Sequence, residues 1–245
     1  MRPLRGIETS LWAPLMDGTY AIVMTLLVLE LPVISIDLVH QYNHHEIGIW
    51  PLVKNLLTLI LGYFGVFLII FDIWVKKRRV LSIIERYCNL SGFESLALLL
   101  SLFIATLLPP VMSLCWKVEQ ELRIQTIAGD KNINVESAEV IILHVLFGVC
   151  GLLIYVIINL LSRQLYIRLK RRDTAPDLGP SLKEASIALS KLHGVRRDTA
   201  SRIIASPIIL FSWLSPQILM FVYGLIGLWH TDNQRENGIG SNGKG

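Results

Sequence analysis

The sequence predicts an all-α, polytopic membrane protein with six transmembrane helices, of which the last two are short. Of its 245 residues, 53% are hydrophobic and 17% are charged, which leaves too little polar surface for a soluble domain of this length. Several apolar stretches also reach the roughly 20 residues that a helix needs to cross a bilayer. We interpret residues 1–230 as one transmembrane domain and residues 231–245, rich in Gly and Asn, as a disordered tail.

The expected helices follow the apolar stretches in chain order. The first four stretches are each long enough to span a membrane, and the run Ser181–Leu192 predicts a short amphipathic helix on the cytoplasmic face. The final stretch, Ala200–Trp229, is interrupted at Ser215-Pro216, and proline disrupts a helix interior. One tilted helix or two short helices both fit it, and the six-helix prediction takes the pair. The expected helices are about 11–33, 49–75, 93–115, 138–161, 201–214 and 216–229.

Basic residues gather in alternate loops and so predict the orientation of the chain. Of the 23 Lys and Arg residues, five lie in Lys76–Arg86 and ten in Arg163–Arg202, whereas the loop 34–48 holds none. Cytoplasmic loops carry the excess of Lys and Arg. The N-terminus and the loops 76–92 and 162–200 are therefore predicted to be cytoplasmic, in a multi-pass protein of the cell inner membrane.

The first expected helix carries an aliphatic stripe. With 3.6 residues per turn, Ile22, Leu26 and Leu29 share one face with Thr25, and Asp17 stands about one turn before them. If several copies gathered around an axis, these side chains would form apolar rings with one hydroxyl ring, and such rings gate pores by dewetting. The alternative is that the stripe only packs against lipid or neighbouring helices, since lipid is as apolar as leucine.

The run from Asp17 to Leu31, DGTYAIVMTLLVLEL, resembles the first helix of the prokaryotic transmembrane protein 175 family, which are potassium-permeable channels. Further similarities cover most of the chain but are less specific. They are Trp50-Pro51 at the start of the second helix, Tyr63, Phe67 and Trp74 before a basic cluster, a third helix that ends on Leu107-Leu108-Pro109, and the break at Ser215-Pro216.

The resemblance implies a homotetramer of six-helix subunits in which each first helix lines the pore. The constriction, which acts as gate and selectivity filter for potassium, would be formed by Ile22, Leu26 and Leu29, with Thr25 as a polar ring. No TVGYG-like loop is present to supply a carbonyl filter.

The hallmark motif of that family, R-x-x-x-F-S-D, is degenerate in this sequence. The corresponding residues are Leu11, Leu15, Met16 and Asp17, so that only the aspartate remains. In the family the motif joins a polar network that holds the pore helices together. Asp17 is therefore expected either to have a different neighbour or to be protonated.

Other charged residues have simpler interpretations. Asp72 lies four residues before Lys76, and we expect the two to pair along one helix. The run Lys76–Arg79 is interpreted as a topology determinant, with anionic lipid contact as an additional role. The histidines between the first two helices, with Asp37 and Glu46, are expected to belong to a solvated polar loop rather than a metal site.

No nucleophile–base pairing, glycine-rich phosphate loop or metal-ligand spacing is present in the sequence, so we predict no enzyme activity, cofactor or bound metal. The expected partners are potassium ions, the lipid bilayer and further copies of the chain, and not nucleic acid. Two alternatives to a channel remain at this point. One is a proton-linked secondary transporter that uses Asp17 and Glu30, and the other is a non-conducting membrane protein that retains the channel fold.

Overall fold

The computed structural model describes residues 9–43, 48–87, 90–127, 138–173, 181–210, 221–223 and 225. This part of the chain is almost entirely helical, which confirms the predicted all-α class. Its long helices are α1 (Thr9–Asn43), α2 (Ile49–Tyr87), α3 (Gly92–Ile127), α4 (Ala138–Asp173) and α5 (Ser181–Leu210). Residues 221–223 add a short helical stretch.

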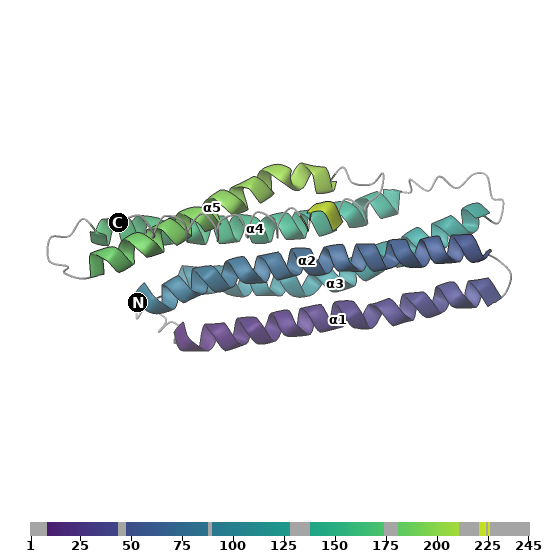
Figure 1. The fold of residues 1–245 in the computed structure, drawn as a ribbon, viewed down its shortest axis with the longest axis horizontal. Helices are drawn as coiled ribbons and strands as arrows, with labels where there is room; N and C mark the ends of the chain where they lie inside the picture. Colours follow the sequence, from purple (N-terminus) through teal and green to yellow (C-terminus); the bar gives the residue numbers. More distant parts are fainter. Residues whose placement is uncertain are drawn as a thin grey trace, which may run out of the picture.

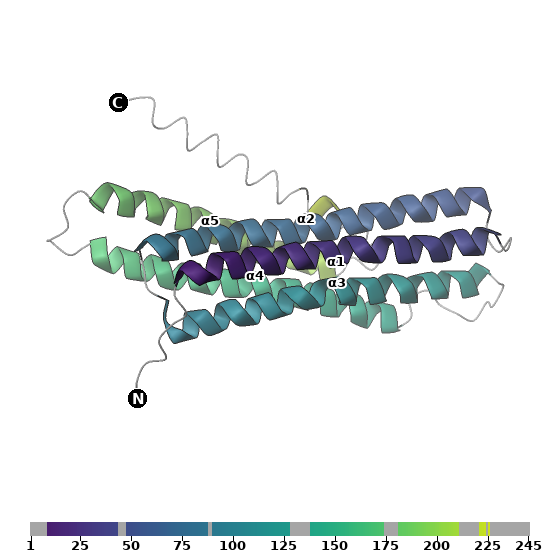
Figure 2. The same cartoon turned by 90° about the horizontal axis from the view of Figure 1, so that it is seen from below.

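The helices form a bundle in which consecutive helices run antiparallel (Figure 1). α1 lies along one side of the bundle, α2 and α3 form a middle layer, and α4 and α5 lie on the opposite side. α1 packs against α2 and α3, whereas α5 packs against α4 and α2. Seen from its own side, α1 lies across the front of the bundle (Figure 2). It is therefore a peripheral helix of the protomer.

Four helices are long and apolar enough to cross a membrane: Leu11–His40, Ile49–Glu85, Gly92–Glu119 and Ile141–Arg171. At 1.5 Å per residue, segments of 28 to 37 residues are about 40 to 55 Å long, so each exceeds the ~30 Å hydrocarbon core of a bilayer. The protein is thus a multi-pass membrane protein. The expected fifth span overlaps α5 in part, and most of the expected sixth lies outside the described residues, so this pair stays a prediction.

All four transmembrane helices extend further than the apolar stretches indicated. α1 continues past Val33 to Asn43, so that most of the expected loop 34–48 is helical. α3 passes through Pro109-Pro110, as the expected range 93–115 implies, and continues to Ile127. Membrane helices tolerate internal proline, because neighbouring groups and local adjustments satisfy the freed carbonyls.

The expected cytoplasmic loop 162–200 is also largely helical. α4 continues to Asp173, and Ser181–Leu192 is the first part of the 30-residue α5 rather than a separate surface helix. The apolar stripe of this segment packs against α4, which supplies a protein partner where the sequence suggested a membrane surface. Its buried side chains are Ala188, Leu192 and Val195.

The start of α3 is fixed by a reciprocal capping contact. The backbone N–H of Ser91 donates to the carboxylate of Glu94 at 2.8 Å, and the backbone N–H of Glu94 donates to the Ser91 hydroxyl at 3.3 Å. This capping box satisfies donors that the first turn of a helix leaves free. Arg168 of α4 pairs with the same carboxylate at 3.1 Å, which ties the start of α3 to the far end of α4.

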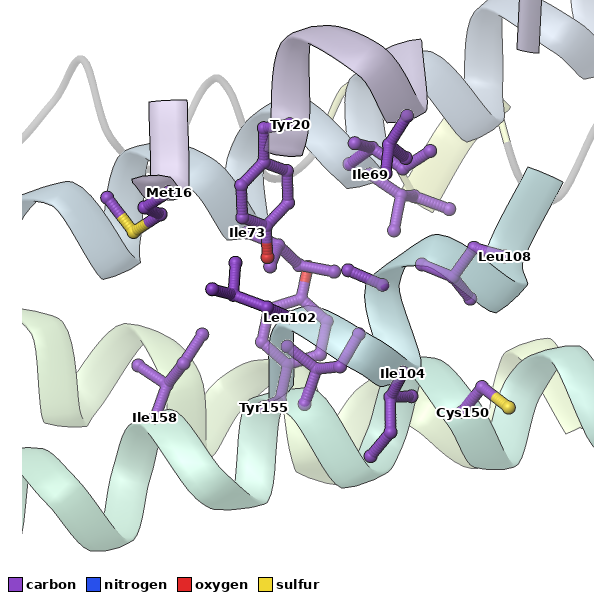
Figure 3. Packing of buried hydrophobic residues seen from close by; sticks show 14 of the residues in the cluster. Met16, Tyr20, Ile69, Ile73, Leu102, Ile104, Leu108, Cys150, Tyr155 and Ile158 are labelled. Carbon is purple, nitrogen blue, oxygen red and sulfur yellow. The ribbon is translucent and has the colours of Figure 1, made fainter. Parts of the chain in front are cut away.

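Buried hydrophobic side chains join α1 to α4 through the middle layer. Tyr20 of α1 and Tyr155 of α4 point into this layer from opposite sides, with Ile73 of α2 and Leu102 of α3 between them (Figure 3). All four are at most 6% exposed. Close packing of this kind is the main attraction between helices in a membrane, where the hydrophobic effect is absent. It leaves the opposite side of α1 open.

Candidate pore-lining helix

The predicted stripe lies together on the outer side of α1. Ile22, Leu26 and Leu29 are 61%, 45% and 60% exposed, and no other helix of the described protomer covers them. Thr25 is also exposed, and its hydroxyl donates to the carbonyl of Ala21 at 2.8 Å. The side chains that anchor α1 to the bundle lie on its opposite side. They include Tyr20, Val23 and Leu27.

The apolar outer side of α1 is longer than the predicted constriction. The exposed residues that continue it at helical spacing are Leu11, Leu15, Val33 and Ile36. The stripe thus runs along nearly the whole helix, with the three predicted residues near its middle. A face of this length is suited to contact either lipid or the equivalent helices of further copies.

Asp17 contacts two side chains of α2. The indole N–H of Trp74 donates to Asp17 Oδ1 at 2.9 Å, and Arg78 Nε lies 3.7 Å from Oδ2. The side chains of Asp17 and Arg78 are 39% and 42% exposed, so solvent screens their ion pair and the Trp74 hydrogen bond is the stronger contact. The expectation of a different neighbour for Asp17 is confirmed.

Glu30 makes the corresponding contact at the other end of the stripe. The hydroxyl of Ser113 donates to Glu30 Oε2 at 2.8 Å, and Lys117 Nζ lies 3.9 Å from the same oxygen. Both partners belong to α3. α1 is therefore held to the middle layer by one acid on each side of the Ile22–Leu29 segment, and this attachment keeps its aliphatic side facing outward.

Replacing Trp74 with phenylalanine is expected to lower the free energy of unfolding by about 1 kcal/mol, because the ring is kept while the hydrogen bond to Asp17 is lost. Thermal unfolding of the purified protein in detergent, followed by circular dichroism, measures the change. Trp50→Phe is the matched control, since Trp50 is 78% exposed at the start of the same helix. Equal effects of the two substitutions would contradict the assigned contact.

A second group of polar side chains lies buried between α2 and α5. Lys76 contacts Asp72, one turn before it on α2, which confirms the predicted pairing. Lys76 Nζ also lies 2.8 Å from Asp198 Oδ2, and Arg202 Nε lies 3.6 Å from Asp72 Oδ2. These four side chains are at most 5% exposed. Two acids and two bases balance in charge, as burial of ions requires. We call these four residues the ion-pair cluster.

Tyrosines complete the hydrogen bonding of the ion-pair cluster. Tyr155 of α4 donates its hydroxyl to Asp72 Oδ2 at 2.8 Å. Arg202 Nη1 donates to the backbone carbonyl of Tyr223 at 2.6 Å, and the Tyr223 hydroxyl donates to the carbonyl of Arg202 at 3.1 Å. The cluster thereby joins α2, α4, α5 and residues 221–223, which are far apart in the sequence.

A segment that contains most of this helix matches the model of a known family. Residues 13–109 match the family model described as Endosomal/lysosomal potassium channel TMEM175. The resemblance to TMEM175 is confirmed. No curated protein and no solved structure matches the chain. The matched segment takes in α1 from Ala13, all of α2, and α3 as far as Pro109.

TMEM175 is a family of potassium channels and not of enzymes, which agrees with the lack of catalytic motifs in the sequence. The TMEM175 match contains the whole predicted constriction together with Asp17 and its partner Trp74. It ends before α4 and α5. The ion-pair cluster therefore joins the matched segment, through Asp72 and Lys76, to a part of the chain that the match does not cover.

Within the segment that matches TMEM175, the side chains of the basic run Lys76–Arg79 are placed differently from our expectation. Lys76 belongs to the ion-pair cluster, and Lys77 lies buried with its Nζ 5.1 Å from the centre of the Tyr20 ring. Of this run, Arg79 is the exposed residue. The expectation that Lys76 and Lys77 contact anionic lipid is therefore wrong, because protein encloses both side chains.

The residues that the sequence did not single out are Asp198 and Arg202. They lie four apart on one helical face, which is a signal that a search for buried pairs would use. They were hidden because the surrounding segment is rich in basic residues and was interpreted as a loop. Of the predicted external histidines, His40 lies on the last turn of α1, while His44 and His45 lie outside the described residues.

Proposed function

We propose that the chain is a subunit of a potassium-permeable cation channel whose pore is lined by α1. The match of residues 13–109 to a potassium channel family carries this proposal. The matched segment includes Ile22, Leu26 and Leu29, which share one exposed side of α1. Four copies of the chain, as the resemblance implies, place these sides around a common axis in the cell inner membrane, with the N-terminus in the cytoplasm.

Conduction through such a pore depends on narrow apolar rings. An ion that passes a ring of isoleucine or leucine side chains loses part of its hydration shell, and the pore closes when the ring expels water. Potassium binds its hydration water less tightly than sodium, so partial dehydration favours potassium. The hydroxyl of Thr25 is bonded to the α1 backbone, and its oxygen retains a lone pair for a passing ion or its water.

The attachment of α1 to the bundle supports this role. Asp17 is bonded to α2 and Glu30 to α3, so the two acids that the transporter alternative requires both have protein partners. They act as structural ties in the proposed channel. The helix is thereby fixed at the periphery of the protomer with its aliphatic side outward.

Ion flux in liposomes tests the proposal. Purified protein is reconstituted into liposomes that contain potassium, and efflux into sodium buffer is compared with that from protein-free liposomes. Passive efflux that prefers potassium is the expected result. Transport that occurs only with an imposed pH gradient would instead identify a proton-linked transporter. Absence of ion flux through a folded protein would identify a non-conducting membrane protein that retains the channel fold.

A further inference from the structure

Residues 72–78 of α2 carry polar contacts on two opposite sides of the helix. Asp72 and Lys76 lie one turn apart, and both point toward α4 and α5. Trp74 and Arg78 also lie one turn apart, on a side about half a turn away, and both reach Asp17 of α1. Two rows of contacts thus share less than two turns of one rigid helix.

The contacts on the α5 side are buried ion pairs. Asp198 reaches Lys76 at 2.8 Å, and Arg202 reaches Asp72 at 3.6 Å. Because each of these side chains is at least 95% buried, none can exchange its partner for water without moving the helix that carries it. The position of α5 against α2 is therefore tied to the integrity of the ion-pair cluster.

The contacts on the α1 side are close to the proposed constriction. Asp17 receives the Trp74 hydrogen bond, and Lys77 lies against the Tyr20 ring one turn further along α1. Ile22 follows Tyr20 by two residues. A rotation or shift of α2 at residues 74–78 therefore acts on α1 immediately before Ile22, the first residue of the proposed constriction.

We infer that Asp198 and Arg202 of α5 are positioning residues for the pore helix α1, acting through residues 72–78 of α2. α1 and α5 lie on opposite sides of the middle layer, so the effect passes through α2 (Figure 1). The inference rests on the proposed function for its consequence, which is a change in the balance of open and closed channels. The inference also predicts a change in how tightly α1 is attached to the bundle, and this change can be measured without ion conduction.

The key variant is Asp198→Asn, which removes the charge that Lys76 contacts and keeps the shape of the side chain. The matched control is Arg197→Gln, which changes the charge of the neighbouring, exposed residue of α5. Asp198→Glu restores the charge and serves as the conservative rescue. Each protein is first shown to be folded and of the same oligomeric size as the parent by size-exclusion chromatography.

Two readouts are taken. In planar bilayers with symmetric potassium, Asp198→Asn is expected to shift the open probability at least about fivefold, the lower end of usual coupling between sites, with the single-channel conductance unchanged. In detergent, hydrogen exchange of the α1 amides at residues 9–20 is expected to become faster by a similar factor. Arg197→Gln and Asp198→Glu are expected to match the parent in both readouts.

A double-mutant cycle separates coupling from general destabilisation. Asp17→Leu removes both the acceptor of the Trp74 hydrogen bond and the partner of Arg78 at the α1 end of the same chain of contacts, so its effect and that of Asp198→Asn are expected not to add. Additive effects of the two substitutions, or an α1 exchange rate unchanged in Asp198→Asn, would overturn the inference. If Asp198→Asn does not fold, the paired replacement Lys76→Met with Asp198→Leu, which leaves no unpaired partner, is tested in its place under the same criteria.

The two proposals fail in different ways. If no protein conducts but α1 exchange responds to Asp198→Asn and the effects are coupled, the positioning role stands and the channel proposal falls. If the parent conducts and Asp198→Asn behaves as Arg197→Gln does in both readouts, the channel proposal stands and the positioning role falls.

Discussion

Asparagine in place of Ile22 is expected to raise potassium efflux from liposomes about tenfold and to lower the preference for potassium over sodium. Ile22 is 61% exposed on the outer side of α1, where the proposed pore axis lies. A polar amide there holds water in the constriction, so that ions pass it with more of their hydration shell. A tenfold rise corresponds to a barrier lowered by about 1.4 kcal/mol. Efflux of both ions is measured in parallel for parent and variant.

The control for this experiment is Leu100→Asn on α3. Leu100 is 50% exposed and aliphatic, but it lies on a helix that the proposal does not place at the pore. The substitution is expected to leave flux and selectivity unchanged while adding the same polar group to the membrane. If Ile22→Asn and Leu100→Asn behaved alike, the stripe on α1 would be a lipid-facing surface and the constriction would be wrongly assigned.

The second large effect is expected at Lys76. Replacing Lys76 with methionine removes the cation that Asp72 and Asp198 share, and loss of one partner from a buried ion pair costs about 3–5 kcal/mol of stability. Lys77→Met is the matched control, because Lys77 is also buried but its ammonium finds no hydrogen-bond acceptor among the residues that the structure describes. We expect Lys77→Met to leave stability unchanged or to raise it, because removing a buried ammonium without an acceptor offsets the lost contact with the Tyr20 ring.

Both proteins are unfolded thermally in the same detergent, and the midpoints are compared. We expect the unfolding midpoint of Lys77→Met to equal or exceed that of the parent, and the midpoint of Lys76→Met to be clearly lower. Adding Asp198→Leu to Lys76→Met is expected to recover part of the loss, because it removes the carboxylate that was left without its cation. A lower midpoint for Lys77→Met than for Lys76→Met would contradict the assignment of the ion-pair cluster.

The aliphatic stripe of α1 was predictable because it depends only on local spacing. Ile22, Leu26 and Leu29 fall on one side of any α-helix, and they are exposed together in the structure. The first four spans were predictable for the same kind of reason, since a long apolar run has few alternatives to a membrane helix. The pairing of Asp72 with Lys76 is likewise local, as the two residues are one helical turn apart.

Helix ends were predicted less well. Apolar stretches mark where lipid surrounds a helix, but α1, α2, α3 and α4 all continue beyond those stretches. Their additional turns are more polar than the spans, and they stay helical by packing on neighbouring helices that sequence patterns do not specify. For the same reason, the sequence pattern predicted a surface helix and a separate span where the structure has the single helix α5.

By itself, the sequence determined the fold class, the four apolar spans and the side of α1 that carries the stripe, because each depends on composition or on helical periodicity. Tertiary structure alone decided which partners the charged residues have on other helices. Asp17 meets Trp74, and Lys76 meets Asp198, across separations that no local pattern encodes. The physical reason is that these partners come from different helices, and only the packing of the helices brings them within contact distance.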